Sequence, residues 1–194
     1  AEVTDKDVSC PDGKRVPYDL LVTIPPHEGS DLIDDAGLGD GLGFGLTDKL
    51  TLKSKKAERV FLLGDNTNVP TSKAGSVAHF QADVVVHNLL REMAGQAAEP
   101  LADGHANCFI ETGFGRAILV DFNYDVQPVP GKFPLPGIGP MTLLEETRLN
   151  HLGKLAFKPI YWHMLLPGRP IPLVGSQMST RGKRMDVLAA RPHA

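Results

Sequence analysis

The sequence predicts an α/β fold, and three observations lead to that class. Two short apolar segments, residues 16–24 and 58–63, have the composition of buried strands. Between residues 73 and 95 the apolar side chains recur at the spacing of a helix. Residues 106–121 then give two strand-like runs around Gly113-Phe114-Gly115, a pattern typical of a β-hairpin. Strands and a long helix are therefore expected in one α/β unit.

The composition is that of a globular protein of one ordinary domain or two small ones, with 194 residues, of which 42% are hydrophobic and 22% charged. No apolar run approaches the roughly 18 residues of a membrane-spanning helix. No charged-then-apolar leader opens the sequence, so no export signal is visible in it. Two cysteines, Cys10 and Cys108, exclude a disulfide-rich scaffold and a four-thiolate zinc site, and no metal site is predicted.

The N-terminal part predicts β structure followed by loops. Residues 2–9 alternate weakly, Pro11-Asp12-Gly13 predicts a turn, and the strand over 16–24 should end at Pro25-Pro26. Residues 28–48 contain six glycines and predict a loop-rich connector. The apolar segment 58–63 should then form a second buried strand.

The second half predicts two helices around the hairpin. Thr71 or Ser72 is expected to cap the first helix, and the last helix should run from about Leu143 to a bend or stop near Pro159. Between them, residues 127–140 hold five prolines and three glycines and predict an extended surface segment. Beyond Pro167 the chain is rich in Pro, Gly and basic residues, and its end is expected to be poorly ordered.

The charge is divided unevenly along the chain. Residues 1–147 have 12 basic and 22 acidic side chains, whereas residues 148–194 have 8 basic side chains and a single acidic one, Asp186. The basic part also carries aromatic and aliphatic side chains, which favours an anionic membrane surface over nucleic acid as its partner. The alternative is a tail that packs on the acidic body or on a sister subunit.

The segment 59–81 has the pattern of a dinucleotide-binding site. An apolar segment ends at Gly64 and Asp65, where glycine permits close approach of a cofactor and the carboxylate can accept hydrogen bonds from ribityl or ribose hydroxyls. The exposed N–H groups expected at Ser72, Lys73, Ala74 and Gly75, with the helix dipole, favour partly negative ligand atoms. The alternatives are an ordinary turn aspartate at position 65 and an ordinary helix start with a solvated Lys73.

These motifs resemble those of a known family. Val60-Phe-Leu-Leu-Gly-Asp65 is similar to the second FAD fingerprint of flavoproteins with two dinucleotide-binding domains. Residues 70–81, 107–113 and 118–124 resemble segments of sulfide:quinone oxidoreductases, and residues 155–168 are similar to the C-terminal amphipathic helix of that family. The resemblance extends over nearly the whole chain.

One part of the family pattern is missing, because no strand leads through Gly-x-Gly-x-x-Gly into a helix. Gly39-Asp-Gly-Leu-Gly43 comes nearest, but it lies in the predicted connector. The resemblance therefore implies a C-terminal fragment with a partial two-dinucleotide-binding-domain fold. Residues 1–57 would be the distal part of the second nucleotide-binding-like domain with a connector, residues 58–98 the last strand and helix of the FAD domain, and residues 99–194 an α+β quinone- and membrane-side domain. Such a fragment is not expected to retain FAD by itself.

The resemblance also implies roles for individual residues. Cys108 falls where the family has its C-terminal redox cysteine, which would exchange sulfur with sulfide, whereas Cys10 matches no motif. The alternative for Cys108 is a structural cysteine in a strand. His79 is a candidate proton shuttle and Glu111 a candidate proton acceptor, each with a purely structural alternative. Candidates for an apolar quinone pocket are aromatic and could equally be core residues: Phe109, Phe157, Tyr161 and Trp162.

The predicted function is oxidation of sulfide through redox cysteines and FAD, with electrons passed to a quinone. The protein is expected to be peripheral to a bacterial or archaeal plasma membrane and not to bind nucleic acid. The sequence does not decide whether the chain forms a homo-oligomer. The first alternative is a related flavoprotein, such as a type II NADH dehydrogenase or a flavocytochrome sulfide dehydrogenase subunit. A third hypothesis is a non-catalytic membrane-surface interaction module.

Overall fold

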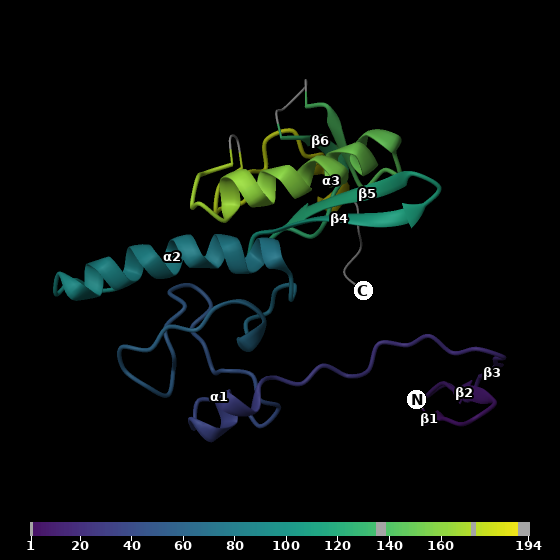
Figure 1. Ribbon diagram of the computed structural model, residues 1–194, viewed down its shortest axis with the longest axis horizontal. Helices are drawn as coiled ribbons and strands as arrows, with labels where there is room; N and C mark the ends of the chain where they lie inside the picture. Colours follow the sequence, from purple (N-terminus) through teal and green to yellow (C-terminus); the bar gives the residue numbers. More distant parts are fainter. Residues whose placement is uncertain (1, 135–138, 172–173, 190–194) are drawn as a thin grey trace.

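The structure is a computed structural model that describes residues 2–134, 139–171 and 174–189. It confirms the predicted α/β class, with two sheets and four α-helices (Figure 1). In chain order the elements are β1 (Glu2–Val3), β2 (Asp7–Ser9), β3 (Arg15–Pro17), α1 (Asp31–Asp35), the 3₁₀ turn η1 (Gly64–Asn66), α2 (Gly75–Met93), β4 (Ala106–Gly113), β5 (Arg116–Phe122), β6 (Gly131–Phe133), β7 (Met141–Leu143), α3 (Arg148–Ile160), the π-helical turn η2 (Tyr161–Leu165) and α4 (Asp186–Ala189).

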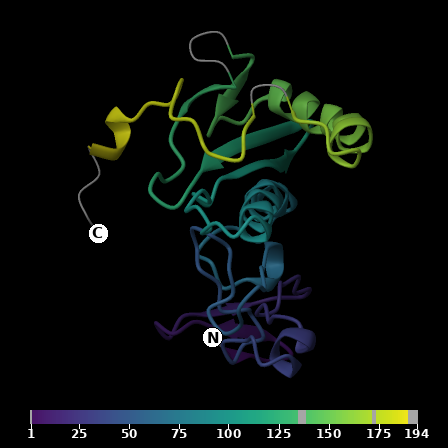
Figure 2. The same ribbon diagram turned by 90° about the vertical axis from the view of Figure 1, so that its left-hand side faces the viewer.

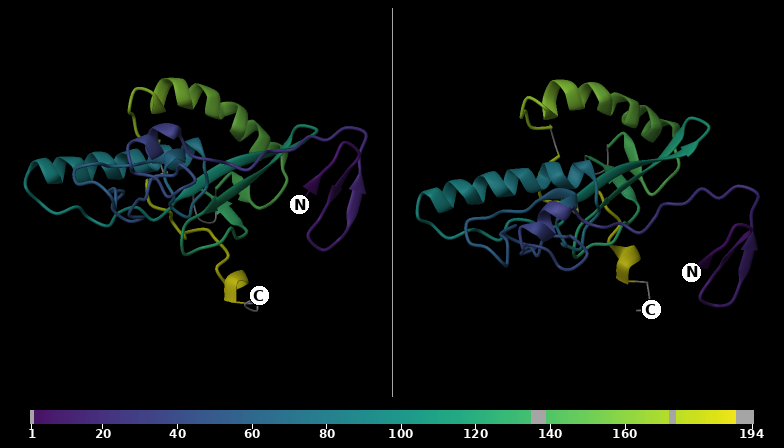
Figure 3. Two further views of the ribbon diagram at one scale, coloured as in Figure 1. Left: turned by 90° about the horizontal axis from the view of Figure 1, so that it is seen from below. Right: turned by 60° about the horizontal axis from the view of Figure 1, so that its bottom comes forward.

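The N-terminal sheet β1-β2-β3 is an antiparallel meander at the far end of an extended segment (Figures 1 and 3). The prediction of a buried strand over 16–24 is wrong, because β3 ends at Pro17. The apolar side chains that follow are 81%, 87% and 79% exposed at Leu20, Val22 and Ile24. Within the described ranges no strand pairs with this segment, so its side chains have no sheet in which to be buried.

The segment 58–63 is not a strand either. Phe61 forms a single bridge with Lys53, and the N–H of Leu62 donates to the carbonyl of Leu52 at 3.0 Å. The segment begins with a turn at residues 58–59, where Arg59 has a positive φ, and these contacts hold the rest of it on the connector. The connector is mostly loop, as predicted, and also contains α1. The apolar run alone does not supply the neighbouring strands that a sheet requires.

Helix α2 confirms the predicted long helix but begins two residues later, at Gly75. Its N-cap is Ala74, which accepts no N–H through a side chain, so the predicted cap by Thr71 or Ser72 is wrong. The Thr71 hydroxyl instead donates to the carbonyl of Gly104 at 2.9 Å. The first turn of α2 consequently has no side-chain cap.

The second sheet has the order β4-β5-β7-β6 and carries α3 (Figure 2). The predicted hairpin is confirmed, with Phe109 of β4 opposite Leu119 of β5. Strand β7 joins β5 in parallel through Leu119 and Leu143, both of which are at most 1% exposed. The core of this layer therefore lies beneath α3.

Helix α3 begins at Arg148, not near Leu143, because residues 141–143 form β7. Thr147 caps it by accepting the N–H of Asn150 at 3.0 Å. Pro159 lies inside the helix and does not stop it. The helix instead changes to the π-type turn η2 directly afterwards, as expected where proline removes one backbone donor.

The proline-rich segment does not lie wholly at the surface, and part of the tail packs against the second sheet. Val129 is only 1% exposed and residues 131–133 form β6, although residues 135–138 of the predicted surface segment lie outside the described residues. In the tail, the Lys183 side chain is buried and paired with Asp121. The alternative that the basic tail packs on the acidic body thus holds at Lys183, while residues 190–194 lie outside the described ranges.

Candidate functional site

An apolar cavity of about 560 Å³ lies between the start of α2, strand β4 and α3. Its wall is completed by residues of β6, β7 and the chain after α3. The fold therefore gathers at one place segments that are separated by about half of the sequence. A cavity of this volume with mostly apolar walls is typical of a site for a small organic ligand.

Cys108 lies on this wall and brings a thiol to the cavity. It is a half-buried, free thiol on β4, opposite Val120 of β5. Its Sγ lies 3.7 Å from the hydroxyl oxygen of Ser76 in the first turn of α2. Sequence reasoning missed Ser76, whose only signal was its place one residue after Gly75 at a helix start.

The start of α2 faces the same cavity through Ala74, Gly75 and Ser76. A Cβ at Gly75 would have no atom within 4 Å, so the space beside this residue is open. Because the first turn has no side-chain cap, its N–H groups and the helix dipole are available to a partly negative ligand atom. Ser72 precedes this turn and is absent from the cavity wall.

The ammonium group of Lys73 is directed away from this ligand space. It donates to the carbonyl of Thr67 and lies 4.9 Å from the centre of the Phe44 ring. Burial lowers the pKa of Lys73, and the charges of Asp65 and Asp40 oppose that effect without cancelling it. The Lys73 side chain thus contacts the loop before α2 and helps to hold it in place.

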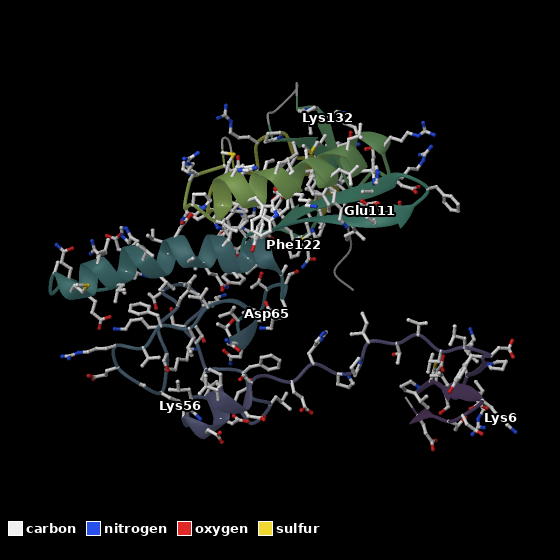
Figure 4. All side chains as sticks on the ribbon, in the orientation of Figure 1. Lys6, Lys56, Asp65, Glu111, Phe122 and Lys132 are labelled. Carbon is white, nitrogen blue, oxygen red and sulfur yellow. The ribbon has the colours of Figure 1, made fainter. Side chains whose placement is uncertain are left out.

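Gly64 and Asp65 lie in η1, on the opposite side of α2 from α3 (Figure 4). The Gly64 N–H donates to the side-chain oxygen of Gln81 at 2.6 Å, which ties η1 to α2. Asp65 is exposed and does not line the cavity. Of the predicted cofactor-binding residues, only Ala74 and Gly75 therefore meet Cys108 at the cavity.

Substitution by alanine should affect stability differently at Gly64 and at Gly75. Gly64 has φ +68°, and a Cβ there would lie 3.2 Å from that of Ala78. We expect Gly64→Ala to lower the free energy of unfolding by about 1–2 kcal/mol, because the positive φ strains an L-residue. Gly75→Ala should leave it unchanged or raise it slightly, since alanine favours a helix and the space is open. Urea unfolding of both variants checks this, and equal losses would contradict it.

Three of the four predicted quinone-pocket aromatics line the cavity: Phe109, Phe157 and Tyr161. Trp162 does not line it and is 57% exposed, packed edge-on against Tyr161 at 5.6 Å between ring centres. Gly153 lets α3 approach the sheet, because a Cβ there would lie 3.1 Å from the Phe109 ring.

His79 and Lys154 are also among the residues of this mostly apolar wall. Glu111 is not part of the cavity wall, and its carboxylate is paired with the ring of His151 on α3 at 3.0 Å. Met141 and Val174 are wall residues that sequence reasoning missed. Nothing in the local pattern of the proline-rich regions around them signals a cavity.

The fold and the site together define a class: an α/β unit in which a cysteine and a helix start meet at an apolar cavity. The chain is similar to sulfide:quinone oxidoreductases. It is 32% identical to the mitochondrial enzyme of Mus musculus over 79% of this chain, and 33% identical to those of Dictyostelium discoideum and Schizosaccharomyces pombe over 80% and 76%. These matches confirm the resemblance seen in the sequence.

The match covers only part of those relatives. The chain spans about a third of their length, namely 33%, 33% and 32%. No protein-family profile matches the sequence.

Among solved structures, the chain resembles one chain of the cryo-EM structure of the Tetrahymena thermophila mitochondrial ATP synthase, with a TM-score of 0.54 and 26% identity. The similarity covers 80% of this chain and 35% of that one. Within the described ranges no helix combines the length and the apolar character needed to cross a membrane.

Proposed function

We propose that this chain is the C-terminal part of an FAD-dependent sulfide:quinone oxidoreductase. The observation that carries the proposal is the position of Cys108, on the wall of an apolar cavity and 3.7 Å from Ser76 at the start of α2. Similarity to sulfide:quinone oxidoreductases over about four-fifths of the chain supports the same activity.

The start of α2 fits one edge of a flavin ring. Its first turn lacks a side-chain cap, and the open space at Gly75 would admit a flat ring. When bound, FAD would supply two-electron redox chemistry between sulfur and quinone. Residues 58–98 would give the last segment and helix of the FAD domain, with Gly64 and Asp65 beside the ribityl chain, and Ser72 and Lys73 holding the loop before the helix.

In this proposal Cys108 forms a disulfide with a second redox cysteine, and sulfide attacks that disulfide, so that one cysteine becomes a persulfide and the other is released as a thiolate. Transfer of the outer sulfur to a nucleophilic acceptor leaves two thiols, and the two electrons removed when these re-form the disulfide would pass to FAD when it is bound. The hydroxyl of Ser76 can donate a hydrogen bond to the Cys108 sulfur, and the dipole of α2 favours negative charge at this end of the helix. In this proposal the second redox cysteine lies outside the present sequence, since Cys10 belongs to the N-terminal hairpin between β2 and β3.

The apolar cavity would bind the ring of a quinone. Phe109, Phe157 and Tyr161 provide flat apolar walls, and His79 and Lys154 provide polar groups at the wall for carbonyl oxygens. Trp162 lies beside Tyr161 and outside the wall, where it would contact lipid.

Residues 148–194 would place the cavity at an anionic membrane surface. Leu149, Leu152 and Leu155 recur along α3 and are 46%, 56% and 58% exposed. Basic side chains occur among them at Arg148 and along the rest of the segment. Exposed leucines with nearby cations are typical of a helix that lies in the lipid interface. The peripheral location at a bacterial or archaeal plasma membrane that the sequence analysis expects is retained as part of this proposal.

Membrane binding should depend on the leucines of α3. We expect Leu152→Ser with Leu155→Ser to weaken binding to phosphatidylglycerol-containing vesicles at least about tenfold, because each leucine loses apolar burial in the interface. Vesicle co-sedimentation at low and high salt measures this. Leu20→Ser, which removes a leucine that is 81% exposed elsewhere, is the matched control. Equal binding by all three proteins would reject the membrane surface.

The enzymatic proposal is tested on the full-length protein that contains this chain. We expect an FAD absorption spectrum that sulfide bleaches and that decylubiquinone restores. Bleaching by NADH but not by sulfide would favour a type II NADH dehydrogenase. Absence of any flavin would reject the proposal.

A second candidate is a non-catalytic subunit of a membrane assembly. The similarity to one chain of a mitochondrial ATP synthase structure favours it. In that case the full-length protein would lack flavin and would co-purify with a stable membrane complex. A homo-oligomer is tested by the same purification, from the mass of the isolated particle.

A further inference from the structure

Three titratable side chains meet in the interior beside strands β4 and β5. Asp121 near the end of β5, His105 before β4 and Lys183 in the tail have side chains that are only 2–3% exposed. His105 Nε2 lies 2.7 Å from one Asp121 oxygen, and the Lys183 ammonium donates to the other. Asn107 also donates to Asp121, at 3.1 Å. Burying such charges is costly unless they are paired, so this cluster must hold its members closely together.

Each of the two ring nitrogens of His105 contacts a hydrogen-bond acceptor. Nδ1 lies 3.0 Å from the carbonyl oxygen of Gly175, which can only accept a hydrogen bond. Nε2 faces a carboxylate, which also accepts. Both contacts of the ring are therefore with hydrogen-bond acceptors, and the ring stacks on Phe80 at 4.3 Å between ring centres. Asp121 lies between the Lys183 ammonium group and the His105 ring.

Burial by itself raises the pKa of Asp121. The hydrogen bonds and charges of His105 and Lys183 outweigh burial, so the pKa lies below the ordinary value of 3.8. The carboxylate consequently stays charged at neutral pH.

This cluster fastens a segment that we call the C-terminal strap, residues 174–184. Further contacts run from the Met178 N–H to the Asp103 carboxylate at 2.8 Å, and from the Arg184 N–H to the Pro130 carbonyl at 2.8 Å. The strap crosses β6 closely, because a Cβ at Gly131 would lie 2.4 Å from the Gly182 oxygen. Figure 2 shows this yellow segment running along the sheet.

The strap begins at the cavity. Val174 lines it, and the next residue, Gly175, is the one that His105 holds. We propose that Asp121 is a positioning residue that, through Lys183 and His105, holds the strap and so keeps the Val174 side of the cavity closed. The consequence for quinone affinity rests on the proposed function, whereas the closure itself does not.

Lys183→Met in the full-length protein is the test variant. It removes one partner and leaves Asp121 paired with His105 and Asn107, so folding should be retained. We expect amide hydrogens of residues 175–184 to exchange at least about tenfold faster, and N-ethylmaleimide to alkylate Cys108 at least about threefold faster. The KM for decylubiquinone should rise about fivefold with kcat changed less than twofold. Lys183→Arg should restore all three values.

Two control variants separate the effect of the Asp121–His105–Lys183 cluster, which we call the latch, from a general loss of stability. Lys132 on β6 is exposed (Figure 4), and its ammonium group donates to the Thr142 hydroxyl. Lys132→Met should match the wild type in every readout. Gly131→Ala should open the strap by steric contact, without changing the charges. If Gly131→Ala accelerates alkylation and Lys183→Met does not, the latch does not hold the strap and the proposal fails.

The remaining outcomes are also distinct. Faster exchange in the strap with unchanged alkylation of Cys108 would show that the strap does not close the cavity, and would overturn the proposal. Faster alkylation in a protein that does not bind decylubiquinone would support the latch and reject the quinone site.

Discussion

Replacing Cys108 by serine should abolish sulfide-dependent quinone reduction, with turnover reduced at least about 1,000-fold. The hydroxyl of serine keeps nearly the same shape beside Ser76, but it cannot form a disulfide or a persulfide and is not ionised near neutral pH. The change falls on the sulfur chemistry alone, so bound FAD and the fold should be retained. Steady-state reduction of decylubiquinone by sulfide, together with the flavin spectrum, measures both effects.

Cys10→Ser is the matched control for this experiment. Cys10 is the other free cysteine and lies in the N-terminal hairpin, which does not contribute to the cavity. Its variant should retain the wild-type rate. If Cys108→Ser keeps near-normal turnover, Cys108 is a structural cysteine of β4 and the proposed mechanism is wrong.

Replacing Asp121 by asparagine should cause the largest loss of stability. The substitution leaves the buried Lys183 ammonium and the His105 ring without their counter-charge, and breaking a buried ion pair costs about 3–5 kcal/mol. For a chain of this size that corresponds to a fall in Tm of roughly 10 °C. Thermal unfolding followed by circular dichroism measures it.

The pH dependence gives an independent measure of the same cluster. The pKa of Asp121 is lower in the folded protein than its ordinary value of 3.8. Its contribution to stability is therefore complete above that value and is lost as the pH falls through the folded-state pKa. The wild type should lose stability below pH 3.8 more steeply than Asp121→Asn. Asp83→Asn, at an exposed position on α2, should leave both Tm and the pH profile unchanged, and an equal effect there would contradict the buried-pair account.

The prediction of strands failed where the partners of a strand were needed. Residues 20–24 and 60–63 are mostly apolar, yet within the described ranges neither segment is part of a named strand. A strand is stabilised by its neighbours, so a local pattern predicts the extended backbone but not the pairing. The hairpin β4-β5 was predicted correctly because both of its strands and its turn lie in one continuous segment.

The sequence by itself determined the α/β class, the long helix α2, the hairpin, and a family resemblance that the matches to sulfide:quinone oxidoreductases confirm. All of these depend on side chains that are near one another in the chain, or on motifs that can be compared letter by letter. Only the tertiary structure brought Cys108 within 3.7 Å of Ser76 and formed the apolar cavity between α2 and α3. It also decided that Lys183 is buried against Asp121, 62 positions away. A basic residue in a proline-rich tail has no local signal of burial, because the carboxylate that pairs with its buried charge lies on a strand that is distant in the sequence.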